Sequence, residues 1–372
     1  MMQKTQRLLS LDVFRGITIA TMIIVNVIIV SPYAALEHSE WHGCTIADVV
    51  FPFFIFAMGV SLSFSISKKI QLGIPRSDIF TYICQRTVII FGLGLLLHMF
   101  PHHLTVGSLS TIRIYGVLQR IALCYLFAAS AFLFLNTWMQ ACLTVILLVG
   151  YWLIMMHVPL LHYGTGNLSP EGNVAAYVDR FLFSSKHLYG KAFDPEGLLS
   201  TLPAIATALL GNLVGIGLRT KISQHKKLCG LIIAGTVCSF LGWTWGQWFP
   251  INKALWTSSY MLWTGGLALY IFAACYWVIE IKQYKQWSKP FEIFGLNAIV
   301  VFFLHVLFFK IQLLIHVPCG NGHNCNLRNY IIQHAFGWAS LPYASLYYAI
   351  TTGLFWLLIL TIMYRKKIFI GI

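Results

Sequence analysis

The chain contains ten apolar runs, and these runs constrain its fold more than any other feature. A helix needs about 20 mainly apolar residues to cross the hydrocarbon core of a bilayer, and each run is close to that length. The runs therefore predict an all-α fold, a polytopic membrane helix bundle of about ten transmembrane helices that forms a single transmembrane domain over residues 1–372. They lie near residues 11–32, 46–66, 79–100, 113–135, 139–157, 198–218, 228–249, 255–279, 292–315 and 343–364.

Charged residues are scarce and unevenly placed. Only 10% of the 372 residues are charged, against about 25% in a typical soluble domain. With a cytoplasmic N-terminus, 15 lysines and arginines lie in the inner segments and 6 in the outer ones. Positive residues accumulate on the cytoplasmic side, so both termini are predicted to be cytoplasmic. The net charge of +14 is thus explained by basic residues that fix the orientation of the spans. A nucleic acid is therefore not expected as a partner.

The loop between the first two runs contains ionisable side chains that a simple connection between two helices does not need. The charge distribution places this loop outside the cytoplasm. Its polar residues, and the acid one turn into the second run, are Glu37, His38, Glu40, Trp41, His42 and Asp48. A carboxylate at the head of a membrane span is costly and usually has a task. This loop is therefore the first candidate for a functional site.

Two other outer segments, 158–197 and 316–342, are long. Loops of this length are usually functional or disordered, and the aromatic residues of the first favour a packed lid. In the second, Cys319 and Cys325 flank a polar stretch, and a local disulfide is expected if that segment is extracytoplasmic. A metal site with His323 is the alternative. The spacing of a four-ligand site is absent, however, and no metal is predicted.

Two pairs of residues place charge within or beside the spans. Asp12 and Arg15 are spaced i, i+3 and can meet on one helix face, either as a self-neutralising pair or with Arg15 turned toward an anionic ligand. Arg113 and Arg120 are seven residues apart and are expected on one face of the fourth helix. An intramembrane arginine must be paired or line a wet cavity. Arg120 is therefore expected to contact either Asp48 or the phosphate of an acyl donor.

Other polar residues inside the runs have both a structural and a functional interpretation. Asn26 lies in the first run, where an asparagine needs a hydrogen-bonding partner or faces a site. Arg86 can snorkel to the inner surface or contact a ligand. Asn297 and His305 are eight residues apart and are expected on roughly one face of the ninth helix, as packing residues or as part of a site.

The segment at residues 250–258 is compact and polar at the predicted outer surface. Lys253 and Trp256 are either interfacial anchors or contacts for a substrate. Elsewhere the chain has no Walker A loop, no Gly-x-Ser-x-Gly elbow and no His-Glu-x-x-His motif. These absences argue against ATPases, the usual serine hydrolases and zincins.

Several separated motifs, in order along essentially the whole chain, resemble the heparan-α-glucosaminide N-acetyltransferase family. They are Leu11 to Gly16, the loop from His38 through Trp41, Thr45 to Pro52, Arg113 to Arg120, Phe193 to Leu198, Asn252 to Tyr260, Pro290 with Phe291, and Gly295 to His305. The resemblance implies acetyl transfer from acetyl-CoA to the amine of a terminal glucosamine, across a membrane. It also implies a homodimer. Compared with the animal enzyme, the stretch before the first span is short, and no luminal domain is expected there.

The resemblance also implies roles for three residues. His38 matches the histidine held to be catalytic, Asn26 matches an asparagine near it, and Asp48 matches a family position too. A histidine with an ordinary pKa near 6.5 can take the proton that a glucosamine ammonium must lose. Asp48 can orient the imidazole, and Asn26 can donate to the developing oxyanion. Alternatively, His38 accepts the acetyl group itself and passes it on. The sequence does not separate these two mechanisms.

The remaining candidates are binding residues. Those expected to contact acetyl-CoA are Arg15, Arg86, Gln119, Arg120, Asn297 and His305. Those expected to contact the acceptor are Glu37, Glu40, Trp41, Lys253 and Trp256. We expect an integral protein of a bacterial inner membrane, in contact with lipid. Two other hypotheses are a solute transporter without chemistry and an acyltransferase of the same architecture acting on a cell-wall or lipid-linked glycan. A transporter would often have inverted repeats and broken helices, and the sequence shows neither convincingly.

Overall fold

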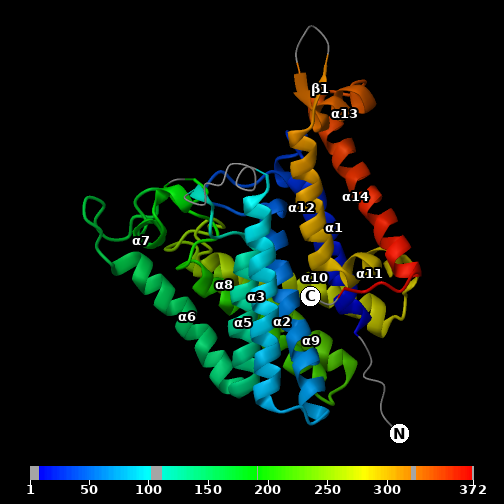
Figure 1. Ribbon diagram of the computed structural model, residues 1–372. Helices are drawn as coiled ribbons and strands as arrows, with labels where there is room; N and C mark the ends of the chain where they lie inside the picture. The colour runs from blue at the N-terminus through cyan, green and yellow to red at the C-terminus, as the bar shows by residue number, and fades with distance from the viewer. Residues whose placement is uncertain (1–7, 102–110, 191, 320–323, 371–372) are drawn as a thin grey trace. The chain divides into compact units, whose positions relative to one another are not determined.

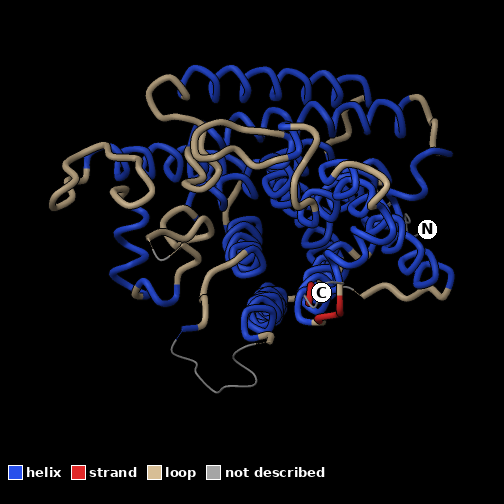
Figure 2. Tube along the Cα trace, turned by 90° about the horizontal axis from the view of Figure 1, so that it is seen from above, coloured by secondary structure: helices blue, strands red, loops and turns tan. Residues whose placement is uncertain are grey.

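The regular secondary structure is almost entirely helical, with long connecting loops, as Figures 1 and 2 show. The computed structural model describes residues 8–101, 111–190, 192–319 and 324–370. Within these ranges nine helices are long and apolar enough to cross a membrane, and a bent helix pair makes ten if it forms one span. The prediction of an all-α polytopic bundle is confirmed, while the cytoplasmic location of the termini stays a prediction.

Helices form in the apolar runs because a backbone in lipid must satisfy its own hydrogen bonds. The helices are α1 Leu9–Val27, α2 Ile46–Gln71, α3 Arg76–Met99, α5 Val117–Phe134, α6 Thr137–His157, α7 Val174–Phe183, α8 Thr201–Arg219, α9 Gln224–Trp245, α10 Ser258–Tyr276 with a π turn over Trp277–Ile281, α11 Lys289–Leu296, α12 Ala298–Leu314, α13 Leu327–Phe336 and α14 Leu341–Arg365. Strands β1 (His316–Pro318) and β2 (Asn324–Asn326) pair antiparallel, with Val317 opposite Cys325. Short 3₁₀ turns lie at Ala34–Leu36, Ser185–His187 and Gln286–Ser288.

The ninth predicted span departs most from expectation. Instead of one helix over 292–315, the segments Gln286–Leu296 and Ala298–Leu314 meet at an angle of 71°. Asn297, between them, leaves the helical conformation, with φ −121° and ψ 35°. Its amide accepts the backbone N–H of Ile370 at 2.9 Å and donates to the carbonyl of Ile368 at 3.2 Å. The break therefore ties the C-terminal segment to this span, and Asn297 and His305 do not share one continuous helix.

The chain forms two compact units. The first comprises Met1–Leu11, Glu40–Cys44 and Pro52–Tyr284, and the second comprises Asp12–Ser39, Thr45–Phe51 and Lys285–Ile372. The expectation of a single domain over residues 1–372 stays a prediction.

Glycines let the helices of the first unit approach closely. A Cβ added to Gly59 of α2 would lie 2.0 Å from the carbonyl oxygen of Ala208 in α8. On the other side of the same contact, a Cβ on Gly211 would lie 2.2 Å from the carbonyl oxygen of Phe56. Small residues at such positions allow backbone-to-backbone packing, which holds helices together where lipid removes the hydrophobic drive. The glycines of α2 and α8 thus allow these two helices of the first unit to pack with their backbones in contact.

The second unit packs the end of α1 against α13 and α14. Val27, Ile332 and Tyr348 form a buried apolar cluster, and the backbone N–H of Ile29 donates to the hydroxyl of Ser345 at 2.7 Å. These contacts fix the point at which α1 ends and the loop toward α2 begins.

Candidate functional site

A histidine and a buried carboxylate meet where the loop enters α2. Nδ1 of His38 lies 2.8 Å from Oδ1 of Asp48. The imidazole side chain is 51% exposed, whereas the Asp48 side chain is 1% exposed. The structure thus holds an accessible ring on a carboxylate that is shielded from water, and an ion pair or hydrogen bond is stronger in such surroundings.

The start of α2 explains why Asp48 lies in this position. Thr45 immediately precedes the helix, and its backbone N–H and hydroxyl donate to Oδ2 of Asp48 at 3.0 and 3.1 Å. The backbone N–H of Ser39 adds a third donor at 3.1 Å. A side chain at the third helical position that bonds back to the capping residue is the capping-box arrangement. Oδ2 therefore caps the helix while Oδ1 holds His38.

Sequence reasoning missed Ser39 and Thr45, although a usable signal was present. A Thr-x-x-acid pattern directly before an apolar run is typical of a helix start, and Thr45 to Asp48 has that spacing. The hydroxyl of Thr45 also donates to the carbonyl of Glu37 at 2.6 Å. The loop is thereby folded back, which brings His38 over the first turn of α2.

The other predicted residues of this loop lie at its surface. Glu37 and Glu40 are exposed, and the carboxylate of Glu37 accepts the backbone N–H of Ser31 at 3.0 Å. Asn26 is not deep in a span, because α1 ends at Val27, and its side chain is exposed. The predicted first span ran too far because the apolar sequence continues beyond the end of the helix.

Arg15 lies at the opposite end of α1 from this loop. Its guanidinium is 3.7 Å from Asp12 and donates to the carbonyl of Gly295, at the end of α11. The self-neutralising pair is confirmed. Twelve residues of helix separate Arg15 from Val27, which is about 18 Å at the rise of an α-helix. Arg15 is therefore far from the point where the His38 loop begins.

Trp41 and His42 belong to the first unit, together with the long segment after α6. The indole N–H of Trp41 donates to the carbonyl of Leu168 at 2.9 Å, and its ring packs edge-on against Phe193, with centroids 5.1 Å apart. His42 contacts the amide of Asn252 at 3.3 Å, and burial lowers the pKa of His42. The expected packing of the 158–197 segment is thus seen at Trp41.

In the first unit, two acids of the segment Phe193 to Gly197 pair with Arg113. Arg113 donates to Asp194 at 2.6 and 2.8 Å and to Glu196 at 2.5 Å. Burial opposes the charged guanidinium, but the hydrogen bonds and charges of the two acids outweigh it and raise the pKa of Arg113. Arg113 precedes α5, so the prediction that it shares a helix face with Arg120 is wrong.

Arg120 is fully buried at the first turns of α5. It donates to the carbonyl of Gly197 at 3.1 Å and to the hydroxyl of Ser200. Its guanidinium also lies 5.0 Å from the ring centroid of Trp256, within range of a cation–π contact. Asp48, its predicted partner, is bonded to His38 instead.

Trp256 is a core residue rather than an interfacial anchor. It is 1% exposed, and its indole N–H donates to the hydroxyl of Thr207 at 3.3 Å. Its φ of +48° is unfavourable for a bulky residue and turns the chain sharply before α10. The anchor interpretation is wrong because a single Trp at a span boundary does not reveal the backbone turn that buries it. Lys253, nearby, is partly buried.

The remaining residues that were predicted to bind acetyl-CoA contact other side chains of the protein. Arg86 lies over the ring of Tyr125, 4.8 Å from its centroid. The amide of Gln119 reaches Nδ1 of His98 at 3.5 Å. His305 is 1% exposed and lies edge-on to Trp356, with centroids 6.3 Å apart. Their predicted contacts with a ligand stay predictions.

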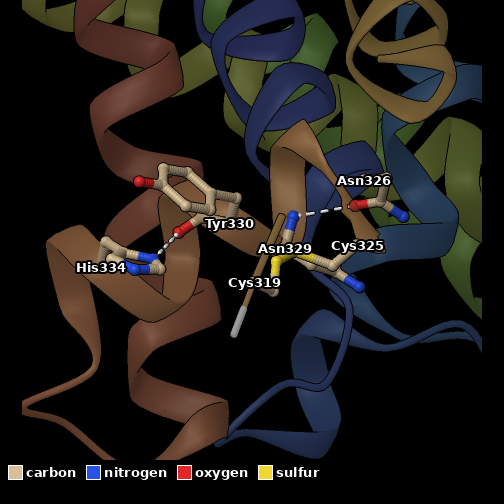
Figure 3. The surroundings of a disulfide bond; sticks show 6 residues. All are labelled: Cys319, Cys325, Asn326, Asn329, Tyr330 and His334. Carbon is tan, nitrogen blue, oxygen red and sulfur yellow. Dashed lines mark hydrogen bonds between the residues drawn. A yellow bond between two sulfur atoms is a disulfide. The ribbon is translucent and has the colours of Figure 1, made fainter. Parts of the chain in front are cut away.

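A disulfide closes the β1–β2 hairpin, as Figure 3 shows. Cys319 and Cys325 are joined, with Cα atoms 5.8 Å apart, which confirms the expected local disulfide. Asn326 follows and caps α13 by accepting the backbone N–H of Asn329 at 2.9 Å. His323 lies outside the described residues, and among those described no group of three His, Cys, Asp or Glu residues could hold a metal ion.

The stability of the region around the segment Phe193 to Leu198 is expected to depend on pH through Asp179. Its side chain is 1% exposed, and it accepts the backbone N–H of Leu198 at 2.9 Å. Burial raises the pKa of Asp179 from 3.8 to about 6. A carboxyl whose pKa rises on folding contributes its stability fully below the unfolded pKa, and that contribution is lost as pH rises through the folded value.

We expect Asp179→Asn to be more stable than the wild type at about pH 8, by up to about 3 kcal/mol, and to lose this advantage toward about pH 4. Asparagine keeps an oxygen that can accept from Leu198 but cannot ionise. Thermal unfolding of the detergent-solubilised protein across this pH range measures the difference. A difference that does not change with pH would contradict the assignment.

The spans and the loop define an integral membrane protein that holds an accessible histidine on a buried carboxylate at the start of a transmembrane helix. The chain belongs to the family described as heparan-alpha-glucosaminide N-acetyltransferase, catalytic, whose sequence profile matches residues 7–242. The resemblance noted in the sequence is thereby confirmed.

Two relatives carry the family's name. Human heparan-alpha-glucosaminide N-acetyltransferase is 29% identical over 421 aligned positions, which cover 98% of this chain and 59% of the human protein. The mouse protein of the same name is 28% identical over 421 positions, covering 98% of this chain and 60% of the mouse protein. The chain thus spans about three fifths of the length of these relatives. Membership supports an acetyltransferase class in general terms.

Proposed function

We propose that this chain is a membrane N-acetyltransferase that moves an acetyl group from acetyl-CoA to the amine of a terminal glucosamine-type sugar. The observation that carries the proposal is the 2.8 Å contact between Nδ1 of His38 and Asp48. A carboxylate on Nδ1 favours the tautomer protonated there, which leaves the basic lone pair on Nε2. Such a pair is the arrangement that general-base and nucleophilic histidines share.

In direct transfer, the nitrogen of the sugar amine attacks the thioester carbonyl, and Nε2 of His38 takes a proton from that nitrogen. The C–S bond then breaks, and the proton passes to the CoA thiolate, which gives N-acetylated sugar and free CoA. In the relayed alternative, Nε2 attacks the thioester first, CoA leaves as the thiol, and the amine then attacks the acetyl-imidazole. Asp48 stabilises the imidazolium in both routes, and Asn26 is proposed to donate to the oxyanion.

The placement of the substrates follows from topology. With the His38 loop outside the cytoplasm of a bacterial inner membrane and acetyl-CoA inside, the donor must reach through the bundle. We keep Arg15, Arg86 and Arg120 as candidates for its phosphates, and Glu37, Glu40 and Trp41 as candidates for the acceptor. A homodimer is part of the same proposal, as is contact with membrane lipid.

The test is acetyl transfer by the purified protein in proteoliposomes, with labelled acetyl-CoA and glucosamine. The expected result is labelled N-acetylglucosamine, formed in equal amount with free CoA thiol. An acceptor panel that includes cell-wall and lipid-linked glycans separates the acyltransferase alternatives. Consumption of no acetyl-CoA with any acceptor would overturn the proposal.

Solute transport is the second candidate, and the break at Asn297 favours it. Discontinuous helices are common at the binding sites of transporters. In the same proteoliposomes, accumulation of glucosamine without release of CoA thiol would support transport. Release of CoA thiol that requires glucosamine would exclude transport without chemistry.

A further inference from the structure

A cavity of about 320 Å³ lies between the end of α8 and the start of α9, in the first unit. Its walls are apolar side chains, among them Leu210, Leu213, Val214, Leu218, Leu231 and Ala234. Both helices are candidate membrane spans, and residues of both line the cavity. The cavity contains none of the residues proposed for acetyl transfer.

Two glycines create the room in this cavity. Gly217 on α8 and Gly230 on α9 both line it, and a Cβ added to either would meet no atom within 4 Å. The glycines of the α2–α8 contact, by comparison, leave no room for a Cβ. Gly217 and Gly230 therefore do not serve close helix packing, and the space above them is open to an occupant.

One end of the cavity is positively charged. Lys226 and Lys227 line it, and no ion pair joins either lysine to an acid among the described residues. Residues 201–245 contain no Asp or Glu. The N-terminus of α9 lies here too, with Ser223 accepting the backbone N–H of Lys226 at 3.4 Å. The positive end of a 22-residue helix adds to the attraction for an anion.

We propose that this cavity binds an anionic phospholipid, with an acyl chain between α8 and α9 and the phosphate at Lys226 and Lys227. An apolar cavity that ends in two lysines, neither of which forms an ion pair with any residue that the structure describes, fits an amphiphile with a negative head. A basic pocket between transmembrane helices is the arrangement that recognises acidic lipid head groups. By the charge distribution of the loops, this end of the cavity faces the cytoplasmic leaflet.

The test is a thermal-shift titration of the detergent-solubilised full chain. The ligands are phosphatidylglycerol, phosphatidylcholine with the same acyl chains, and inorganic phosphate. Phosphatidylglycerol is expected to raise the Tm at much lower concentration than the other two, because a ligand of the folded state stabilises it. Each lysine near an anionic lipid contributes roughly a fivefold factor, so the double variant Lys226→Gln, Lys227→Gln should bind roughly 25-fold more weakly.

Gly230→Leu fills the cavity and is expected to remove the response to phosphatidylglycerol. Gly150→Leu is the matched control, since Gly150 lies on the spanning helix α6 and also has open space at Cβ; it should respond as the wild type does. If Gly230→Leu does not fold, the lysine variant decides. Equal responses to the two lipids, an equal response to phosphate alone, or an unchanged response in the lysine variant would each overturn the proposal.

Discussion

His38→Ala is expected to lower acetyl transfer by on the order of a thousandfold or more while leaving the protein folded. The loss follows because Nε2 of His38 is the proposed base or acetyl carrier, and alanine supplies neither. The free energy of unfolding should fall by only about 1 to 3 kcal/mol, because Oδ1 of Asp48 loses one partner while the removed side chain is 51% exposed and opens no cavity in the core. The measurement is kcat for acetylation of glucosamine, with Tm as the check on folding.

His42→Ala is the matched control for this prediction. His42 is in the same loop, but it contacts Asn252 rather than an acid. Its removal should change the rate only a few-fold. Free imidazole added to His38→Ala should restore part of the activity and should do nothing for His42→Ala. Equal losses in the two variants, or full activity in His38→Ala, would refute the assignment of His38.

The positions of the spans were within reach of sequence reasoning, and the role of Asp48 beside His38 was expected from the family resemblance. Lipid imposes both the length and the apolar character of a crossing helix, so hydropathy alone locates the spans. The carboxylate at the head of α2 was conspicuous because such placement is costly. That Asp48 contacts His38 also depends on the folded loop, which the hydroxyl of Thr45 closes onto Glu37.

Features that depend on distant partners were out of reach. Asn297 breaks a run that is mainly apolar in sequence, because its amide binds Ile368 and Ile370, about 70 residues away. Arg113 and Arg120 were expected on one helix face, yet Arg113 precedes α5 and pairs with acids, whereas Arg120 contacts Gly197 and Ser200. Nothing in the local pattern shows that these partners lie some 80 residues downstream.

Asp48 makes two sets of hydrogen bonds, one that holds His38 and one that caps the start of α2. Oδ1 holds the imidazole, and Oδ2 accepts from the backbone of Ser39 and from Thr45. An asparagine has only one oxygen. If that oxygen faces the backbone donors, the amide NH₂ faces Nδ1, which must then be unprotonated, and the proton moves to Nε2. If the oxygen faces Nδ1, the NH₂ points at other donors and the cap is lost.

Asp48→Asn is therefore expected to lower kcat by on the order of a thousandfold and to cost about 1 kcal/mol of stability through the weakened cap. The equivalent change in hydrolase triads lowers kcat by at least as much. Thr45→Val is the comparison variant, because it weakens the cap and the closure of the loop onto Glu37 but leaves position 48 a carboxylate that can still hold His38. It should cost a similar free energy of unfolding and lower kcat by less than about tenfold. If both variants lost activity in proportion to stability, Asp48 would be only a helix cap. A large loss of kcat in Asp48→Asn alone would mean that the carboxylate sets the protonation of His38.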